Sequence, residues 1–222
     1  MNVALRPLPH LTIEVVHDLV CPWCYLGLRR LRRGLAGQPE VEIAFTWRAF
    51  LLNPDMPRAG MTRDEYLIRK FGNEERARRL FASIAQIGLA ECVAFRFDRV
   101  RHMPSSVDAH RLVRFAARAG RDLEVVEALF AAHFNEGADI GDVSCLTAIA
   151  AQTGLDAGEV RQFLTSDQEI DAVHADNLRA HRLGINGVPC FIIGGGHAIA
   201  GAQEPAVISR LIDVALLESA AF

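Results

Sequence analysis

The stretch VVHDLVCPWCYLG, Val15–Gly27, joins an apolar run to two closely spaced cysteines, and the rest of the chain is best interpreted outward from it. The run that leads into it, Leu11–Val16, is apolar and β-branched, which is typical of a buried strand. Pro22 then begins a pattern of leucines at helical spacing, and proline is favoured at the first position of a helix. Cys21 and Cys24 are therefore predicted to lie where a strand passes into a helix.

The predicted position of Cys21 at the start of a helix favours redox chemistry. Free backbone N–H groups and the positive end of the helix dipole meet there, and both favour thiolate over thiol. Cys24 follows one helical turn later, within disulfide reach, so one sulfur can attack a partner while the other resolves the mixed disulfide. We interpret the pair as a redox couple, with the intervening Pro22 and Trp23 facing the substrate.

A zinc site and a purely structural pair of thiols are the alternatives. Tetrahedral zinc needs four ligands, usually a second CxxC or a closely spaced histidine pair. The other cysteines, Cys92, Cys145 and Cys190, are scattered, and no histidine pair has ligand spacing. We therefore predict no metal site. Two inert buried thiols would not require a position between a strand and a proline-started helix.

The order of elements predicts an α/β fold. Alternation in Val41–Trp47 predicts a second strand, which completes a parallel βαβ unit. Only helices, and no strand, are expected between Arg48 and Thr165. A long helix over Asp167–Leu183, a hairpin that begins with the strand Cys190–Ile193, and a last helix follow. The outer parts together give βαβ–αββα, the thioredoxin fold, with an inserted all-helical domain: residues 1–50 plus 166–222 form the thioredoxin-like domain, and 51–165 the insertion.

The stretch GINGVPCF supplies the second functional signal. It places a Val-Pro step just before a strand, where thioredoxin-like folds hold a cis proline, and X–Pro is the bond at which the cis form is accessible. Pro189 would pack against the cysteine pair, and the backbone of Val188 would be free to pair with an extended substrate. The alternative is an ordinary trans proline at the start of a strand.

The chain resembles the DsbA-like thioredoxin superfamily, and within it the FrnE-like dithiol–disulfide oxidoreductases. The resemblance covers nearly the whole chain and is carried by the segments CPWCYLG, FLLNPDMP, DAHRL, EGADIG, GINGVP and AGAQ. It implies a thioredoxin fold with a helical insertion, an attacking Cys21, a resolving Cys24 and a cis Pro189. It also implies that no metal or organic cofactor is bound.

Two departures from the family pattern stand out. Many relatives place a buried acid six residues before the first cysteine, where this chain has Val15. Glu14 is adjacent but on the opposite strand face, so a water or His17 is a candidate to move the resolving proton, unless His17 is simply structural. The residue after the proline is Cys190, which is either a third thiol close to the pair or a small buried apolar residue.

The predicted function is a cytoplasmic thiol–disulfide oxidoreductase or isomerase acting on protein or low-molecular-weight thiols. The alternative is a glutathione-dependent isomerase or transferase acting on a small aromatic or polyketide-like molecule. Enzymes of that class resemble this chain but place serine at the position of Cys21. Their pocket would here be lined by residues of the insertion and its flanks, with glutathione as co-substrate. The candidates for that lining are Phe50, Leu51, Asn53, His110 and Arg111. A non-catalytic binding module is a third reading.

Composition limits the partners. The formal net charge of −3 gives no global attraction for nucleic acid or an anionic membrane. No apolar run approaches the roughly 20 residues needed to span a bilayer. No secretory signal is recognisable in MNVALRPLPHLTIEVV, so the cytoplasm is the expected compartment. The sequence makes no prediction of oligomeric state.

Overall fold

The computed structural model describes residues 10–37 and 41–219 and centres on a four-stranded mixed sheet in the order β2-β1-β5-β6. β1 (His10–His17) runs parallel to β2 (Glu42–Ala49) and antiparallel to β5 (Cys190–Ile193), which forms a hairpin with β6 (His197–Ala200). The predicted parallel βαβ unit and C-terminal hairpin are confirmed. Most of the N-terminal stretch MNVALRPLPHLTIEVV, in which no secretory signal was recognised, lies outside the described residues.

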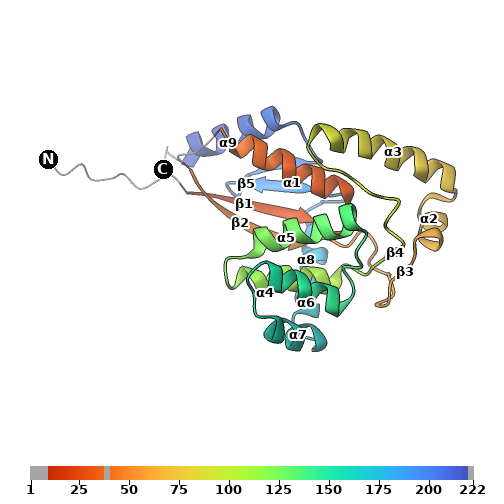
Figure 1. Cartoon of the computed structure of the whole chain (residues 1–222). Coiled ribbons are helices and arrows are strands. Elements are labelled where there is room, and N and C mark those ends of the chain that lie inside the picture. The colour runs from red at the N-terminus through yellow and green to blue at the C-terminus, as the bar shows by residue number, and fades with distance from the viewer. Residues whose placement is uncertain (1–9, 38–40, 220–222) are drawn as a thin grey trace.

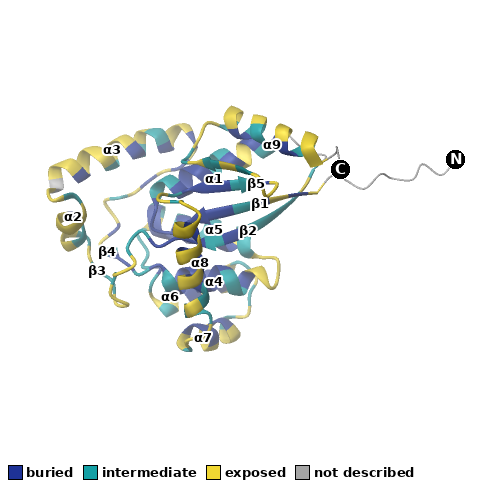
Figure 2. Cartoon of the chain, turned by 180° about the vertical axis from the view of Figure 1, so that it is seen from behind, coloured by how far each residue is buried: buried dark blue, intermediate teal, exposed yellow. Residues whose placement is uncertain are grey.

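Helices cover both faces of the sheet (Figures 1 and 2). α1 (Pro22–Leu35) and α9 (Pro205–Ser219) lie on one face, and α8 (Ile170–Arg182) lies on the other. Successive side chains of β1 point to opposite faces of the sheet, so the strand contributes to the packing on both sides. Val15 belongs to the main core, whereas Val16 packs in a separate cluster on the side of α8.

The segment between β2 and α8 is mainly helical and wraps around one edge of the molecule. Its elements are β3 (Met61–Thr62), α2 (Arg63–Phe71), α3 (Glu74–Ala90), β4 (His102–Met103), α4 (Val107–Ala117), α5 (Asp122–Ala131), a π-helix (Ala132–Glu136), α6 (Val143–Gln152) and α7 (Ala157–Thr165). Local capping residues start several of these helices. Thr62 and Glu65 form a capping box before α2, and the Asn73 side chain accepts the Arg76 N–H before α3.

Three details differ from the sequence-based expectation. β3 and β4 pair as a two-residue antiparallel ladder in a region where no strand was predicted, because so short a pair leaves no alternating pattern. One of the helices expected between Arg48 and Thr165 continues from α5 into the π-helix Ala132–Glu136, before Gly137 adopts a left-handed conformation. α8 begins later than expected because Glu169, at its start, has a φ of 63°.

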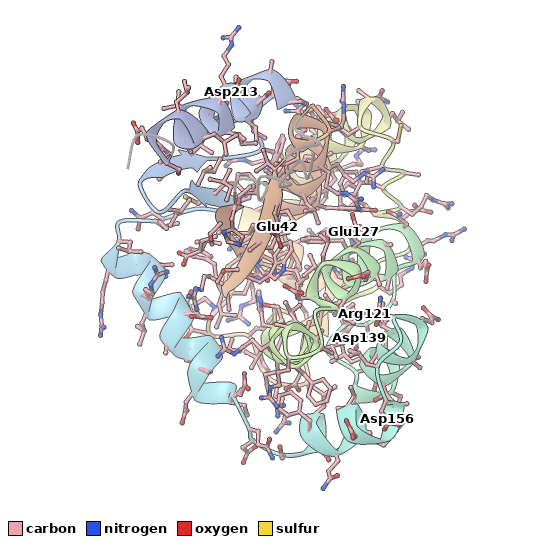
Figure 3. All side chains as sticks on the ribbon, turned by 90° about the vertical axis from the view of Figure 1, so that its left-hand side faces the viewer. Glu42, Arg121, Glu127, Asp139, Asp156 and Asp213 are labelled. Atoms are coloured by element: carbon pink, nitrogen blue, oxygen red, sulfur yellow. The ribbon has the colours of Figure 1, made fainter. Side chains whose placement is uncertain are left out.

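The main hydrophobic core is shared by the sheet layer and the helical segment. Tyr25 of α1 stacks on Phe130 of α5, with ring centroids 5.2 Å apart. In a view turned by 90°, Asp213 on α9 and Asp156 at the start of α7 mark opposite sides of the molecule (Figure 3). The division into two domains stays a prediction.

In the described part of the chain, no helix combines the length and the apolar character that crossing a membrane requires.

Candidate redox-active site

Cys21 occupies the N-cap position of α1, at the end of the turn that follows β1. Its backbone is extended (φ −98°, ψ 112°) and its N–H donates to the Asp18 carbonyl at 3.0 Å. Pro22, as the first helical residue, has no N–H that would need a partner. The Cys21 thiol donates to the carbonyl oxygen of Val188 at 3.7 Å. Strand end, proline and helix start therefore place this sulfur beside the segment that precedes β5.

Cys24 lies one turn further along α1 and is enclosed by the core. Both cysteines are buried, and no disulfide joins them in this structure. Burial, and then the hydrogen bond and charge of the neighbouring Cys21 sulfur, raise the pKa of the Cys24 thiol well above its usual value. The two sulfurs thus differ in environment: Cys21 borders an open cavity and Cys24 does not.

The segment that carries Val188 reaches the cysteines because α1 leaves room for it. The Val188–Pro189 peptide bond is cis. Gly27 of α1 faces Pro189 so closely that a Cβ at Gly27 would lie 2.7 Å from the proline Cγ. A methyl group cannot fit there without displacing the ring, which explains the glycine inside the helix.

Asp18 is a buried residue beside the cysteine pair that sequence reasoning did not single out. It is fully buried, and its carboxylate accepts the N–H groups of Val20 at 3.3 Å and Leu52 at 2.7 Å. Burial alone would raise its pKa, but His110, the Leu52 N–H and Ser106 outweigh this effect, so the pKa of Asp18 is lowered. The charge also contributes to raising the pKa of Cys24. An acidic residue three positions before a CxxC was the available signal.

His17 and His110 form a buried aromatic cluster beside Asp18. Their ring centroids are 5.0 Å apart, and His110 Nε2 lies 3.7 Å from Asp18 Oδ1. His17 Nδ1 lies 3.2 Å from the Arg48 carbonyl oxygen and its ring also packs edge-on against Trp47. Burial, together with the nearby His110, lowers the pKa of His17 to about 3. This ring is neutral at physiological pH and is packed like a core residue.

A cavity of about 250 Å³ opens next to Cys21 and is called the aromatic cavity below. Its walls come from the start of α1, from α2 and α3, from the loop before β4, from the π-helix and from the segment before Pro189. Pro22, Trp23 and Val188, the three residues predicted to face the substrate, all line it. The sequence-based prediction did not include the α2 and α3 side chains.

Comparison with known proteins decides the family. Residues 12–213 match the DSBA-like thioredoxin domain. The chain belongs to this family. DsbA-like proteins are thiol–disulfide oxidoreductases, and the thioredoxin fold predicted from the element order is confirmed.

Several solved structures share the DsbA-like fold. A probable DsbA oxidoreductase from Streptomyces coelicolor is 31% identical, covers 94% of this chain and 91% of its own, and superposes with a TM-score of 0.84. The cytosolic disulfide reductase DsbM from Pseudomonas aeruginosa has a TM-score of 0.62 at 18% identity, over 95% of this chain and 97% of its own. Among curated proteins, YwbO of Bacillus subtilis, described as uncharacterized, is 27% identical over 90% of this chain and 94% of its own length.

The DsbA-like chain places several other candidate residues away from Cys21. Phe50 and Cys190 pack together in the small core with Val16, on the side of the sheet that faces α8. Of the two alternatives for Cys190, a third thiol close to the pair or a small buried residue, the packing supports the second. Burial also raises the pKa of the Cys190 thiol. Glu14 is bound to Arg48 and Arg179, as expected of an opposite-face position.

The expected small-molecule lining is not met in this DsbA-like site. Neither Phe50, Asn53 nor His110 borders the aromatic cavity. Leu51 is enclosed in a small cluster with Ala49. The Arg111 guanidinium is fully buried and donates to the carbonyl oxygens of the last residues of α7 and of Ser166 just after it. These residues failed as candidates because motif resemblance does not indicate which side of a strand or helix faces the cavity.

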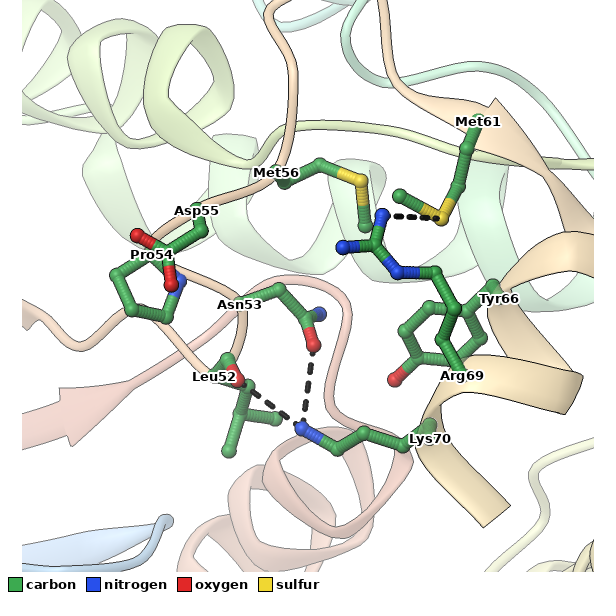
Figure 4. A pocket seen from close by; sticks show the side chains of 9 residues that line it. All are labelled: Leu52, Asn53, Pro54, Asp55, Met56, Met61, Tyr66, Arg69 and Lys70. Atoms are coloured by element: carbon green, nitrogen blue, oxygen red, sulfur yellow. Dashed lines mark hydrogen bonds between the residues drawn. The ribbon is translucent and has the colours of Figure 1, made fainter. Parts of the chain in front are cut away.

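Asn53 instead lines a neighbouring pocket of about 210 Å³ (Figure 4). Its Oδ1 accepts a hydrogen bond from Lys70 Nζ at 3.1 Å.

Within residues 10–37 and 41–219, no group of three or more His, Cys, Asp or Glu side chains is arranged to hold a metal ion.

Proposed function

We propose that this DsbA-like protein exchanges disulfides through Cys21 and Cys24, with Cys21 as the attacking sulfur. The observation that carries the proposal is the contact of the Cys21 thiol with the Val188 carbonyl beside the aromatic cavity, which Cys21 lines and Cys24 does not. A substrate sulfur that enters from the cavity meets Cys21 first. The raised pKa keeps Cys24 protonated until a mixed disulfide has formed.

The proposed reaction has two balanced steps. The Cys21 thiolate attacks one sulfur of a substrate disulfide, the substrate S–S bond breaks, and one substrate thiolate leaves. Cys24 then loses its proton and attacks the Cys21 sulfur, which releases the second substrate thiolate. The substrate gains two electrons and two protons, and the protein is left with a Cys21–Cys24 disulfide. The reverse sequence oxidises a substrate dithiol.

Pro189 and Val188 would orient the substrate in this reaction. Pro189 has no N–H that could compete for the sulfurs, and Val188 lines the cavity together with Cys21, whose thiol donates to its carbonyl. We propose that the backbone of Val188 pairs with an extended substrate. The few, mostly scattered cysteines of this chain and the cytosolic location named for DsbM favour the cytoplasm. In that reducing compartment a closely spaced pair of thiols is catalytic rather than structural.

A glutathione-dependent isomerase or transferase is the second candidate. A 2-hydroxychromene-2-carboxylate isomerase shares the fold with a TM-score of 0.70, over 95% of this chain, at 15% identity. The apolar cavity beside Cys21 favours a small-molecule ligand in either case. An enzyme that activates the thiol of glutathione would not need a sulfur at position 21.

The test compares Cys21→Ser, Cys24→Ser and Cys92→Ser in an assay of disulfide exchange with oxidised glutathione and with a reduced, unfolded protein. Cys92 is exposed and outside the site, so Cys92→Ser is the matched control. An oxidoreductase loses exchange in Cys21→Ser, stalls after one step in Cys24→Ser and keeps full activity in Cys92→Ser. Equal activity in all three variants would contradict the proposal and favour the glutathione-dependent candidate.

A further inference from the structure

The aromatic cavity has the size and the lining of a site for a single ring. At about 250 Å³ it exceeds the roughly 150 Å³ at which an apolar protein cavity can hold benzene. It falls just short of the roughly 300 Å³ at which pockets for larger ligands begin. Six aromatic side chains line it among aliphatic ones. They are Trp23, Tyr66, Phe71, Phe81, Phe97 and Phe134.

The charged residues of the cavity are of one sign. Among the residues that the structure describes, Arg63 and Lys70, both from α2, line it, and no Asp or Glu does. Burial lowers the pKa of the lining residue His133 to about 4, so that ring adds no charge at neutral pH. The cavity is therefore cationic, although the whole chain carries a formal charge of −3.

Neither cation is neutralised by a carboxylate within the described part of the chain. The Arg63 guanidinium lies 5.8 Å from the centroid of the Phe81 ring. Lys70 Nζ donates to two neutral acceptors, the Leu52 carbonyl and Asn53 Oδ1, each at 3.1 Å (Figure 4). These contacts hold the Lys70 ammonium in place and leave its charge available to an anion.

We infer that the sulfur compound presented to Cys21 is a low-molecular-weight thiol or disulfide with an aromatic body and a carboxylate. The ring would occupy the cavity, the carboxylate would lie at Arg63 and Lys70, and the sulfur would face Cys21. This inference rests on the proposed exchange reaction and names its substrate class. The chemistry is that of the two steps above, with the disulfide form of the substrate as the oxidant.

The test measures the rate at which the fully reduced protein consumes three disulfides in stopped flow. The probes are 5,5′-dithiobis(2-nitrobenzoate), an aromatic dianion; 4,4′-dithiodipyridine, a neutral aromatic; and cystamine, an aliphatic dication. The variants are Arg63→Gln and Lys70→Met. Arg69→Gln is the matched control, because Arg69 lies on the same helix but lines only the neighbouring pockets.

Arg63→Gln and Lys70→Met are each expected to slow the reaction of the nitrobenzoate disulfide at least fivefold. The rate with dithiodipyridine should stay within twofold, since that probe carries no carboxylate. Arg69→Gln should change neither rate. Phe81→Leu should slow both aromatic probes and leave cystamine unaffected, because only the aromatic probes place a ring in the cavity.

Equal losses with all three disulfides, or no loss with any, would overturn the inference while leaving the exchange reaction intact. Faster exchange with a disulfide-bonded unfolded protein than with the nitrobenzoate disulfide, lost in Lys70→Met, would assign the cavity to polypeptide substrates and also overturn it. Failure of the wild-type protein to react with any probe, or equal reaction by Cys21→Ser, would instead remove the proposed function itself.

Discussion

The Cys21 sulfur lies 3.7 Å from the carbonyl oxygen of Val188, although the two residues are 167 positions apart in the chain. This contact joins the first helix to the segment before β5 and places the start of the CPWC motif at the aromatic cavity. Gly27 makes the approach possible from the side of α1, because it leaves space for the Pro189 ring.

Gly27→Ala is expected to destabilise the protein and to slow disulfide exchange. The added methyl group would displace Pro189, and overpacking of this kind costs about 1–3 kcal/mol. Urea denaturation measures the free energy of unfolding, and exchange with oxidised glutathione measures the activity. Gly37→Ala is the control, because no atom of the described residues would lie within 4 Å of a Cβ at Gly37. Equal stability and activity of the two variants would show that the Gly27–Pro189 contact does not position the site.

Stability is expected to fall as the pH drops below about 6.5. Burial lowers the pKa of His17 to about 3 and that of His133 to about 4, whereas an unfolded histidine has a pKa of about 6.5. Between these values the unfolded chain binds more protons than the folded one. The free energy of unfolding then decreases by about 1.4 kcal/mol per pH unit for each histidine.

Chemical denaturation at several pH values between 7.5 and 5 measures this dependence. His133→Gln should reduce the slope of the free energy of unfolding against pH by the contribution of one histidine. His174→Gln, which removes an exposed ring of α8, should leave it unchanged. A free energy of unfolding that stays constant over this pH range would contradict the assignment of buried neutral rings.

Asp18→Asn in a Cys21→Ser background is expected to lower the pH at which Cys24 ionises. Burial remains the main cause of the raised pKa of Cys24, but the Asp18 charge adds to it. The measurement is the pH dependence of Cys24 alkylation by iodoacetamide, followed by peptide mass spectrometry. Asp171→Asn, an exposed substitution on α8, serves as the control. An unchanged or higher midpoint for Asp18→Asn would argue that its charge does not reach Cys24.

The parts of the fold that local sequence determines were predictable. A β-branched run, a proline at the first helical position and an alternating strand define the βαβ unit, and the capping box at Thr62 marks the start of α2. The cysteine pair and Pro189 were recognisable for the same reason, because each lies at a junction between elements with a distinct local signal.

The surroundings of the site depend on long-range packing, which local patterns do not encode. The sequence carries no local signal for the burial of Asp18, which follows from contacts with Leu52 and His110 on other elements. The cavity walls come from α2 and α3, whose amphipathic patterns do not indicate which neighbour they face. Phe50 follows β2 and packs toward α8, away from the cavity.

The most direct test of the central claim is to trap the reaction after its first step. Cys24→Ser is mixed with oxidised glutathione, quenched with acid and digested, and the modified peptide is located by mass spectrometry. Attack by the Cys21 sulfur, which lines the cavity, predicts one glutathione on the Cys21 peptide that persists in Cys24→Ser. In the wild-type protein this glutathione should be lost rapidly as a Cys21–Cys24 disulfide forms. Modification at Cys92, Cys145 or Cys190 with Cys21 left free would contradict the assignment of Cys21 as the attacking residue.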